Sequence, residues 1–317
     1  MFYPFKGIPS RLQLKRAYTP ARADWKFLYF TDMVKEGNSI GTDFAGDVVQ
    51  IGENANGKGV ELDDFVAGFV LAHSDPANAA FQGYVKIRPE STIVLPKGKL
   101  SYEQAATLAA ASATAAQGLF HRLKLPQPWL PAKEPLPVLI WGGSTSVGMY
   151  AIKLAKLSGL LVAATASPRN HDLLKKFGAD IVFDYRDPEA PRLIKEWSHG
   201  KITSALDAIS EKDSTQLCAK AFGEAGGKIA SVGLVLGDNG VANVEVVQIQ
   251  VGAGNNPARP TEFALMSEWY RRLPQYLSEL NGIPLKVWDG GLDGVSEALD
   301  YMKAGKVSAE KVIINIA

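Results

Sequence analysis

The chain has 317 residues, with 34 Lys and Arg against 33 Asp and Glu, and 46% hydrophobic residues. That charge balance gives no argument for binding a nucleic acid or a membrane surface, and no apolar run is long enough to cross a bilayer. The single cysteine, Cys218, excludes an internal disulfide and a cysteine zinc cage. We therefore expect a soluble, cytoplasmic protein of two domains.

The first hundred residues are predicted to form a β-rich domain. Gly, Asn and Pro turns separate short β-rich runs, a pattern typical of an irregular barrel or sandwich. These runs lie at 44–51, 64–70 and 83–87. The end of the chain is expected to return to this domain, with helices around Trp269 and over 294–304 and a strand at 311–316.

From about residue 136 the pattern alternates between strands and helices. Strands are predicted at 136–141, 160–165, 181–184, 203–209 and 228–232. Helices are predicted at 144–158, 171–177, 188–197 and around Cys218. Asn170 stands where it could cap the second of these helices. Repeated strand–helix units predict an α/β domain with a doubly wound parallel sheet, the Rossmann arrangement. We assign 111–260 to this dinucleotide-binding domain, and 1–110 with 261–317 to the β-rich substrate domain.

The most informative segment is the glycine-rich turn Trp141-Gly142-Gly143-Ser144-Thr145-Ser146-Val147-Gly148. It follows a buried strand and opens a helix, the setting that a dinucleotide-binding fingerprint requires. Glycines let the backbone approach a pyrophosphate, and the helix N-terminus offers unpaired N–H groups. The hydroxyls of Ser144, Thr145 and Ser146 are expected to add donors. The alternative is a plain Gly/Ser turn, because the spacing departs from strict G-x-G-x-x-G.

The end of the second strand indicates which dinucleotide is bound. NAD sites carry an Asp or Glu about 20 residues after the loop, to hold the ribose hydroxyls. Here the strand is followed by Ser167-Pro168-Arg169-Asn170, which contains no acid. A hydroxyl, a guanidinium and an amide suit a 2′-phosphate, so NADP is the predicted cofactor. The alternative is that Arg169 is an ordinary surface arginine at the start of a helix.

Several short motifs, in this order and spacing, carry a resemblance to a known family. They are Ala23-Asp24-Trp25-Lys26, Gly41-Thr42-Asp43-Phe44-Ala45-Gly46, Ala105-Ala106-Thr107 with Ala113-Thr114-Ala115-Ala116, Ser167-Pro168-Arg169-Asn170, Phe183-Asp184-Tyr185-Arg186, and Gly305-Lys306-Val307-Ser308 with Glu310-Lys311. With the glycine loop in mid-chain, they make the chain resemble the zinc-free medium-chain dehydrogenase/reductase superfamily, which includes quinone and enoyl reductases. Within it, the chain is most similar to the fungal trans-acting enoyl reductases of polyketide synthesis.

The resemblance implies a GroES-like fold for the β-rich domain and roles that spacing alone does not supply. Lys26 and Thr114 would be the catalytic residues, at the nicotinamide end of a cleft between the domains. Tyr185 would pack near the adenine ribose and the 2′-phosphate. The other residues implied in cofactor binding are Asp24, Gly233, Leu234, Val307 and Ser308. The alternatives are that Lys26 is simply solvated, that Thr114 only packs within its helix, and that Tyr185 is an ordinary half-buried tyrosine.

Two features depart from relatives in this superfamily. Thr42 stands where zinc-dependent members have a metal-binding histidine, and the four histidines show no paired spacing, so no metal is expected. These histidines are His73, His121, His171 and His199. Residues 1–13 do not resemble the family's β-rich opening, so we expect the N-terminal domain to be incomplete and to lack its first strands.

These observations predict an NADPH-dependent oxidoreductase that transfers hydride to an α,β-unsaturated carbonyl of a small-molecule substrate. Two alternatives stay open: a quinone or aldehyde reductase, and a non-catalytic NADPH-binding protein, which an incomplete N-terminal domain favours. A polyketide synthase partner is implied only by the resemblance. The sequence does not decide between a monomer and a homodimer.

Overall fold

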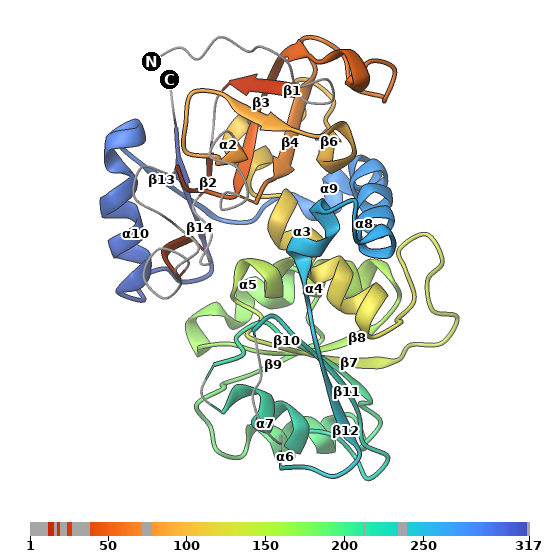
Figure 1. The fold of residues 1–317 in the computed structure, drawn as a ribbon. Helices are drawn as coiled ribbons and strands as arrows, with labels where there is room; N and C mark the ends of the chain where they lie inside the picture. The colour runs from red at the N-terminus through yellow and green to blue at the C-terminus, as the bar shows by residue number, and fades with distance from the viewer. Residues whose placement is uncertain are drawn as a thin grey trace. The chain divides into compact units, whose positions relative to one another are not determined.

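The computed structural model describes residues 12–15, 18–19, 24–26, 39–71, 78–211, 213–233 and 240–315. The chain divides into two compact units, each described here by itself (Figure 1). The first unit comprises residues 1–110, 252–307 and 311–317, and the second comprises residues 111–251 and 308–310. The segment 308–310 therefore belongs to the second unit, although the strand that follows it belongs to the first.

The second unit is built on a six-stranded parallel sheet with the strand order β12-β11-β10-β7-β8-β9. Its strands are β7 (Pro137–Trp141), β8 (Leu161–Thr165), β9 (Ile181–Phe183), β10 (Ser204–Asp207), β11 (Gly227–Ser231) and β12 (Val244–Gln248). The chain moves outward from β7 to β9 and then crosses to the other side of β7 for β10 to β12. The direction of winding reverses between β7 and β10, which confirms the predicted doubly wound sheet.

Four helices cover the two faces of this sheet. They are α4 (Ser146–Leu157), α5 (His171–Lys176), α6 (Ala190–Trp197) and α7 (Ser214–Lys220). Figure 1 shows α4 and α5 on one face and α6 and α7 on the other. Because both faces are covered, β7 is apolar throughout, and its residues Val138 to Trp141 are buried. No helix in the described ranges is long and apolar enough to cross a membrane.

Three local expectations for this unit were wrong or incomplete. The strand predicted at 203–209 ends at Asp207, because the Asp207 carboxylate accepts the backbone N–H groups of Ile209 and Ser210 and turns the chain. Strand β12 was not predicted. Asn170 does not cap α5: its backbone has φ −104° and ψ −3°, and its side-chain amide donates to Ser308 Oγ at 3.1 Å.

The first unit contains an eight-stranded sheet with the path β13-β14-β2-β3-β1-β5; β4 also pairs with β3, and β6 pairs with β4. Its strands are β1 (Leu12–Lys15), β2 (Tyr18–Thr19), β3 (Asp43–Ile51), β4 (Phe65–Phe69), β5 (Val85–Ile87), β6 (Thr92–Val94), β13 (Leu285–Trp288) and β14 (Lys311–Ile314). All described pairs are antiparallel except β13 with β14. This unit is the β-rich domain that the sequence predicts. Its core is formed around Phe44, Val48, Val66 and Val85.

The beginning of this unit bears on the expectation of missing strands. Strand β1 pairs with β3 on one side and with β5 on the other. The rest of that expectation concerns residues 1–11, which lie outside the described residues.

The helices of the first unit are α2 (Tyr102–Ala106), α8 (Pro260–Arg272), α9 (Leu277–Leu280) and α10 (Val295–Lys303). The start of α3 (Ala109–Ala116) also belongs to it.

A buried ion pair joins two segments of the first unit that are far apart in the sequence. Lys311 Nζ, at the start of β14, lies 2.7 Å from the Asp43 carboxylate at the start of β3, and the two side chains are 5% and 0% exposed. Asp43 also accepts the backbone N–H of Ala110, and Lys311 donates to the carbonyl of Thr107. Burial raises the pKa of the Asp43 carboxyl, and the Lys311 ammonium opposes that rise. The pair fixes two segments 268 residues apart.

We expect Lys311→Met to lower the free energy of unfolding by about 3–5 kcal/mol, because it leaves the Asp43 carboxylate buried without its cation. Lys156→Met is the matched control. It breaks the half-exposed pair of Lys156 with Asp180, at 3.0 Å, and is expected to cost less than about 1 kcal/mol. Urea unfolding followed by circular dichroism measures both. Equal losses in the two variants would contradict the structural role given to the buried pair.

Candidate functional site

The glycine loop after β7 is a close-packed turn in which side chains have no room. Gly142 has φ +77°, a left-handed conformation that favours glycine. A Cβ at Gly148 would lie 2.3 Å from the Gly142 carbonyl oxygen. A Cβ at Gly143 would lie 2.9 Å from the Leu174 side chain on α5 and 3.1 Å from Ala164 on β8. These three glycines allow helix α4 to start directly against the end of β7.

The neighbouring strand holds the loop in place. The backbone N–H of Gly142 donates to Thr165 Oγ1 at 3.0 Å, and that of Gly143 donates to the Thr165 carbonyl at 2.8 Å. Thr165 is the last residue of β8 and is fully buried. The loop backbone is therefore tied to the strand whose end was predicted to select the dinucleotide.

Helix α4 begins with a side-chain cap at Thr145. Thr145 Oγ1 accepts the backbone N–H of Gly148 at 2.9 Å and donates to the Gly142 carbonyl at 2.9 Å. The Thr145 hydroxyl is thus used within the loop. Ser144, Ser146 and Val147 are half-buried around it. The first turn of a helix directs backbone N–H groups and a positive dipole end outward, which suits an anion such as a pyrophosphate.

The ends of β8 and β9 form one continuous edge beside this loop. The backbone N–H of Ala166 donates to the Phe183 carbonyl at 3.0 Å, so the segments after the two strands are neighbours. Ser167 is half-buried, Pro168 and Arg169 are exposed, and Asn170 is buried through its bond to Ser308. Of the residues predicted to select the dinucleotide, Arg169 is the cation that solvent reaches.

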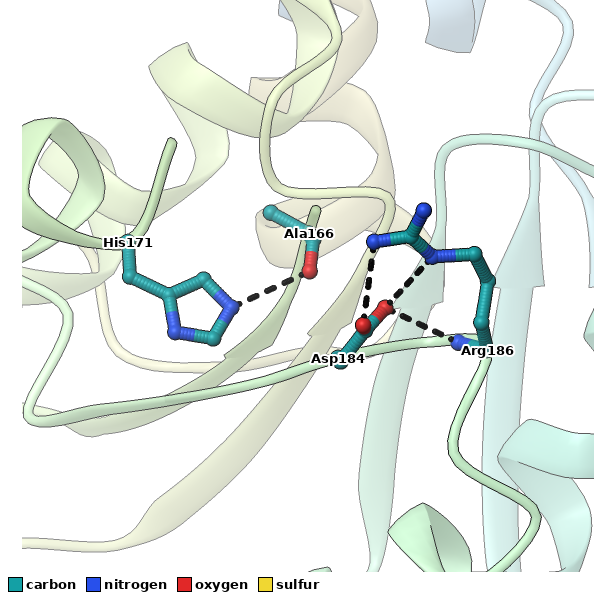
Figure 2. Close-up of polar contacts among 4 residues, drawn as sticks. All are labelled: Ala166, His171, Asp184 and Arg186. Carbon is teal, nitrogen blue, oxygen red and sulfur yellow. Dashed lines mark hydrogen bonds and ion pairs between the residues drawn. The ribbon is translucent and has the colours of Figure 1, made fainter. Parts of the chain in front are cut away.

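A second cation lies on the same edge and was not among the predicted site residues. Arg186 donates from Nε and Nη2 to the two oxygens of Asp184, each at 3.0 Å (Figure 2). These bonds hold the pKa of the Asp184 carboxyl below its usual value. The guanidinium also lies 5.6 Å from the centre of the exposed Tyr185 ring. The signal in the sequence was an arginine two residues after Asp184, the acid that directly follows β9.

His171, at the start of α5, completes this group. Its Nε2 lies 3.1 Å from the Ala166 carbonyl oxygen, as Figure 2 shows. Because a carbonyl only accepts, Nε2 carries a proton in this contact. The structure places His171 half-buried beside the end of β8. The segment after β8 thus carries Arg169 and His171 where NAD-binding proteins carry a carboxylate.

The remaining predicted residues are placed as follows. Asp24 is buried and Lys26 is half-buried in a short helical segment of the first unit, and Lys26 Nζ lies 5.9 Å from the Trp25 ring centre. Thr114 is 8% exposed in the part of α3 that belongs to the second unit. Their catalytic roles stay predictions. Gly233 follows β11, and a Cβ there would lie 2.8 Å from Ser210 Cβ.

Val307 and Leu234 were also predicted to contact the cofactor. Val307 packs against a small apolar cluster of the first unit that contains Ala298 and Val312. Leu234 lies outside the described residues. Cofactor contacts of either residue therefore stay predictions.

Metal-ligating and nucleophilic groups give no competing site in the described part of the chain. No group of three His, Cys, Asp or Glu side chains there is arranged to hold a metal ion, and His73 lies outside the described residues. Cys218 is fully buried on α7, and burial raises the pKa of its thiol well above the usual value. The thiol is therefore held protonated and away from solvent, which removes it as a nucleophile.

Comparison with known proteins places this geometry in a family. A family model described as zinc-binding dehydrogenase matches residues 146–252. A trans-enoyl reductase of Alternaria alternata is 35% identical over 306 residues, which cover 92% of this chain and 88% of that protein. A trans-enoyl reductase of Gibberella zeae is 34% identical over 305 residues, covering 90% and 84%.

Solved structures show the same fold. The CurK enoyl reductase superposes with a TM-score of 0.80 at 19% identity, covering 100% of this chain and 94% of that one. A quinone oxidoreductase of Pseudomonas syringae gives a TM-score of 0.76 at 18% identity, covering 99% and 94%.

The doubly wound sheet, the second β-rich unit and these relatives define an oxidoreductase of the medium-chain dehydrogenase/reductase superfamily, of the enoyl reductase type. At 35% identity over nine-tenths of its length, the chain belongs to the trans-enoyl reductase family. The predicted resemblance is confirmed. Enzymes of this superfamily generally use a nicotinamide cofactor, and the glycine loop fits one because its cradle excludes any Cβ.

We expect Gly148→Ala to lower the free energy of unfolding by about 1–3 kcal/mol, because its methyl group would overlap the Gly142 carbonyl. Gly83→Ala is the control, since no atom lies within 4 Å of its added Cβ and the change is expected to stay within about 0.5 kcal/mol. Thermal unfolding measures both. If Gly148→Ala were as stable as Gly83→Ala, the loop would not be close-packed.

Proposed function

We propose that this protein is an NADPH-dependent, zinc-independent reductase that transfers hydride to an α,β-unsaturated carbonyl. The observation that carries the proposal is the edge formed by the glycine loop, the start of α4 and the ends of β8 and β9. It combines backbone donors with arginine side chains and has no acid directly after β8. The trans-enoyl reductases among its relatives support the substrate class.

The loop residues Gly142 to Gly148 hold the pyrophosphate in this proposal. Their glycines allow close backbone approach, and the first turn of α4 provides N–H donors with a favourable dipole. The Thr145 hydroxyl keeps the loop in shape by bonding Gly142 and Gly148 rather than the ligand. Bound NADPH would supply the hydride.

The preference for NADPH over NADH rests on charge at the ends of β8 and β9. Arg169 is exposed there, and Ser167 adds a hydroxyl. Asp184 would repel a 2′-phosphate if it stood alone, but Arg186 holds both of its oxygens and balances its charge. Tyr185, beside Arg186, offers an exposed ring to the adenosine. These groups favour a dianionic phosphate over a ribose hydroxyl.

Lys26 and Thr114 are proposed to act at the reacting end of the cofactor. Hydride addition to the β-carbon of an enoyl group develops negative charge on the carbonyl oxygen, which a cation or hydroxyl donor stabilises. Lys26 is the cation proposed to donate to that oxygen or to the cofactor ribose, and Thr114 is the hydroxyl proposed to act in the same step. Asp24, two residues before Lys26 and 2% exposed, is proposed as a cofactor-binding residue of the same segment.

The partner of this chemistry is a small-molecule substrate. A polyketide synthase that presents the substrate is proposed from the family resemblance alone, and a cytoplasmic location stays a prediction. A quinone or aldehyde reductase, and a non-catalytic NADPH-binding protein, are the alternatives that the following assay separates.

We expect the purified chain to oxidise NADPH, followed by the loss of reduced-nicotinamide absorbance at about 340 nm, with a crotonyl thioester as substrate. A quinone and an unsaturated aldehyde serve as competing substrates. Turnover of the quinone alone would overturn the enoyl assignment. Cofactor binding with no turnover of any substrate would favour the non-catalytic alternative, and no binding of either NADPH or NADH would overturn the proposal as a whole.

Arg169→Ala is expected to raise the Kd for NADPH by about tenfold or more, because a charge-assisted hydrogen bond to a phosphate is worth about 1.5–3 kcal/mol. The Kd for NADH should change less than about threefold, since NADH has no 2′-phosphate. Arg192→Ala is the matched control, because Arg192 is an exposed arginine of α6 paired with Glu189. Fluorescence titration measures the six Kd values of the wild type and the two variants with NADPH and NADH. Equal losses for NADPH and NADH would contradict 2′-phosphate recognition by Arg169.

A further inference from the structure

Asp207, the last residue of β10, is a buried acid that the proposed function has not used. Its side chain is 0% exposed, and none of the ion pairs in the described part of the chain includes it. A carboxylate without a cation is costly to bury unless hydrogen bonds satisfy both oxygens. The donors to the Asp207 carboxylate therefore show which segments it holds in place.

Four donors converge on the Asp207 carboxylate. Oδ1 accepts the backbone N–H groups of Ile209 and Ser210, both at 3.0 Å. Oδ2 accepts the hydroxyls of Ser214 and Thr215 on α7, both at 2.8 Å. One oxygen thus shapes the loop after β10, and the other attaches it to α7. Because a carboxylate only accepts, it matches four donors without conflict.

The loop that Asp207 shapes has a strained backbone. Ser210 has φ +51°, a left-handed conformation that costs a non-glycine residue roughly 1–3 kcal/mol. Its Oγ lies 3.1 Å from the Asp207 carbonyl and 2.7 Å from Ser231 Oγ at the end of β11. Ser231 in turn donates to the Gly233 carbonyl at 2.9 Å. The network therefore fixes the loops after β10 and β11 together.

The same network reaches the glycine loop through Ile209. The Ile209 side chain fills the space beside Gly142: a Cβ there would lie 2.6 Å from Ile209 Cγ1. Asp207 is paired with Trp141, the residue before Gly142, and the N–H of Ala208 donates to the Trp141 carbonyl at 3.0 Å. The position of Ile209 against Gly142 thus depends on the N–H bond that Asp207 accepts.

The contact between Ile209 and Gly142 lies at the point in the sheet where a ligand is expected to bind. The winding of the sheet reverses between β7 and β10, and in doubly wound sheets ligands bind outside the carboxyl ends of the strands at such a reversal. The glycine loop follows β7, and the Asp207 loop follows β10. The two loops form the opposite sides of this point.

We propose that Asp207 is a positioning residue for the dinucleotide, because its carboxylate holds Ile209 against Gly142 and so fixes the glycine loop. The inference rests on the proposed function. Asp207 does not touch the ligand; it acts through Ile209, and through Ser210 and Ser231 on the loop after β11.

The test compares four variants by NADPH titration, each below its own unfolding transition. Asp207→Ala leaves the two loop N–H groups without their acceptor and is expected to raise the Kd for NADPH about tenfold. Asp207→Asn is expected to stay within about threefold of the wild type, because its amide oxygen accepts both N–H groups while its NH2 donates to the hydroxyls, which can also accept.

The other two variants separate positioning from stability. Ser214→Ala with Thr215→Ala removes only the bonds on the α7 side, so the unfolding temperature should fall while the Kd stays within about threefold. Ile209→Ala leaves the Asp207 bonds intact but removes the contact with Gly142, and it should raise the Kd as Asp207→Ala does. The Ile209→Ala variant also tests the proposal if the Asp207→Ala variant does not fold.

Two results would overturn the inference while leaving the proposed function intact. In the first, Asp207→Ala and Ile209→Ala bind NADPH like the wild type. In the second, the α7-side variant weakens binding as much as they do, which would make the network merely structural. A wild-type protein that binds no nicotinamide cofactor would instead overturn the proposed function and this inference together.

Discussion

The architecture of the candidate site depends on one close approach between two backbone segments. Helix α4 starts so near to the end of β7 that a Cβ at Gly148 would lie 2.3 Å from the Gly142 carbonyl. No residue with a side chain fits this contact without moving the helix or the strand. The contact fixes the direction of α4, and with it the direction of the N–H groups and of the helix dipole. Everything proposed about phosphate binding follows from this placement.

The edge formed by the segments after β8 and β9 is characterised by its charge rather than by its shape. The segment after β8 carries an arginine and no acid, and the acid that follows β9 is held by Arg186. Arg186 therefore has two effects: it neutralises Asp184, and it adds a guanidinium to the side where Arg169 is exposed. Since charged hydrogen bonds are stronger than neutral ones, a few arginines can change which dinucleotide is favoured without any change of fold.

The buried polar groups of the two units serve different ends. In the first unit, Asp43 and Lys311 join segments that are distant in sequence, and each satisfies the other's charge. In the second unit, Asp207 pairs with no cation among the described residues and is satisfied by donors within eight residues along the chain. The first arrangement holds a sheet together, whereas the second shapes a loop. The same kind of residue thus stabilises a fold in one place and positions a site in another.

The sequence by itself determined the alternation of strands and helices, the glycine loop and the missing acid after β8, because these are periodic or local patterns set by backbone geometry and burial. It also placed the motifs that contain Asp43 and Lys311, but not the fact that these residues pair. Only the tertiary structure decided that Asn170 bonds Ser308 instead of capping α5, that Arg186 holds Asp184, and that Asp207 ends β10. The Asn170–Ser308 bond joins residues 138 apart in the sequence, so it depends on packing across the whole unit. The contacts of Arg186 and Asp207 are local in the sequence, but they depend on turn conformations that a pattern of residue types does not specify.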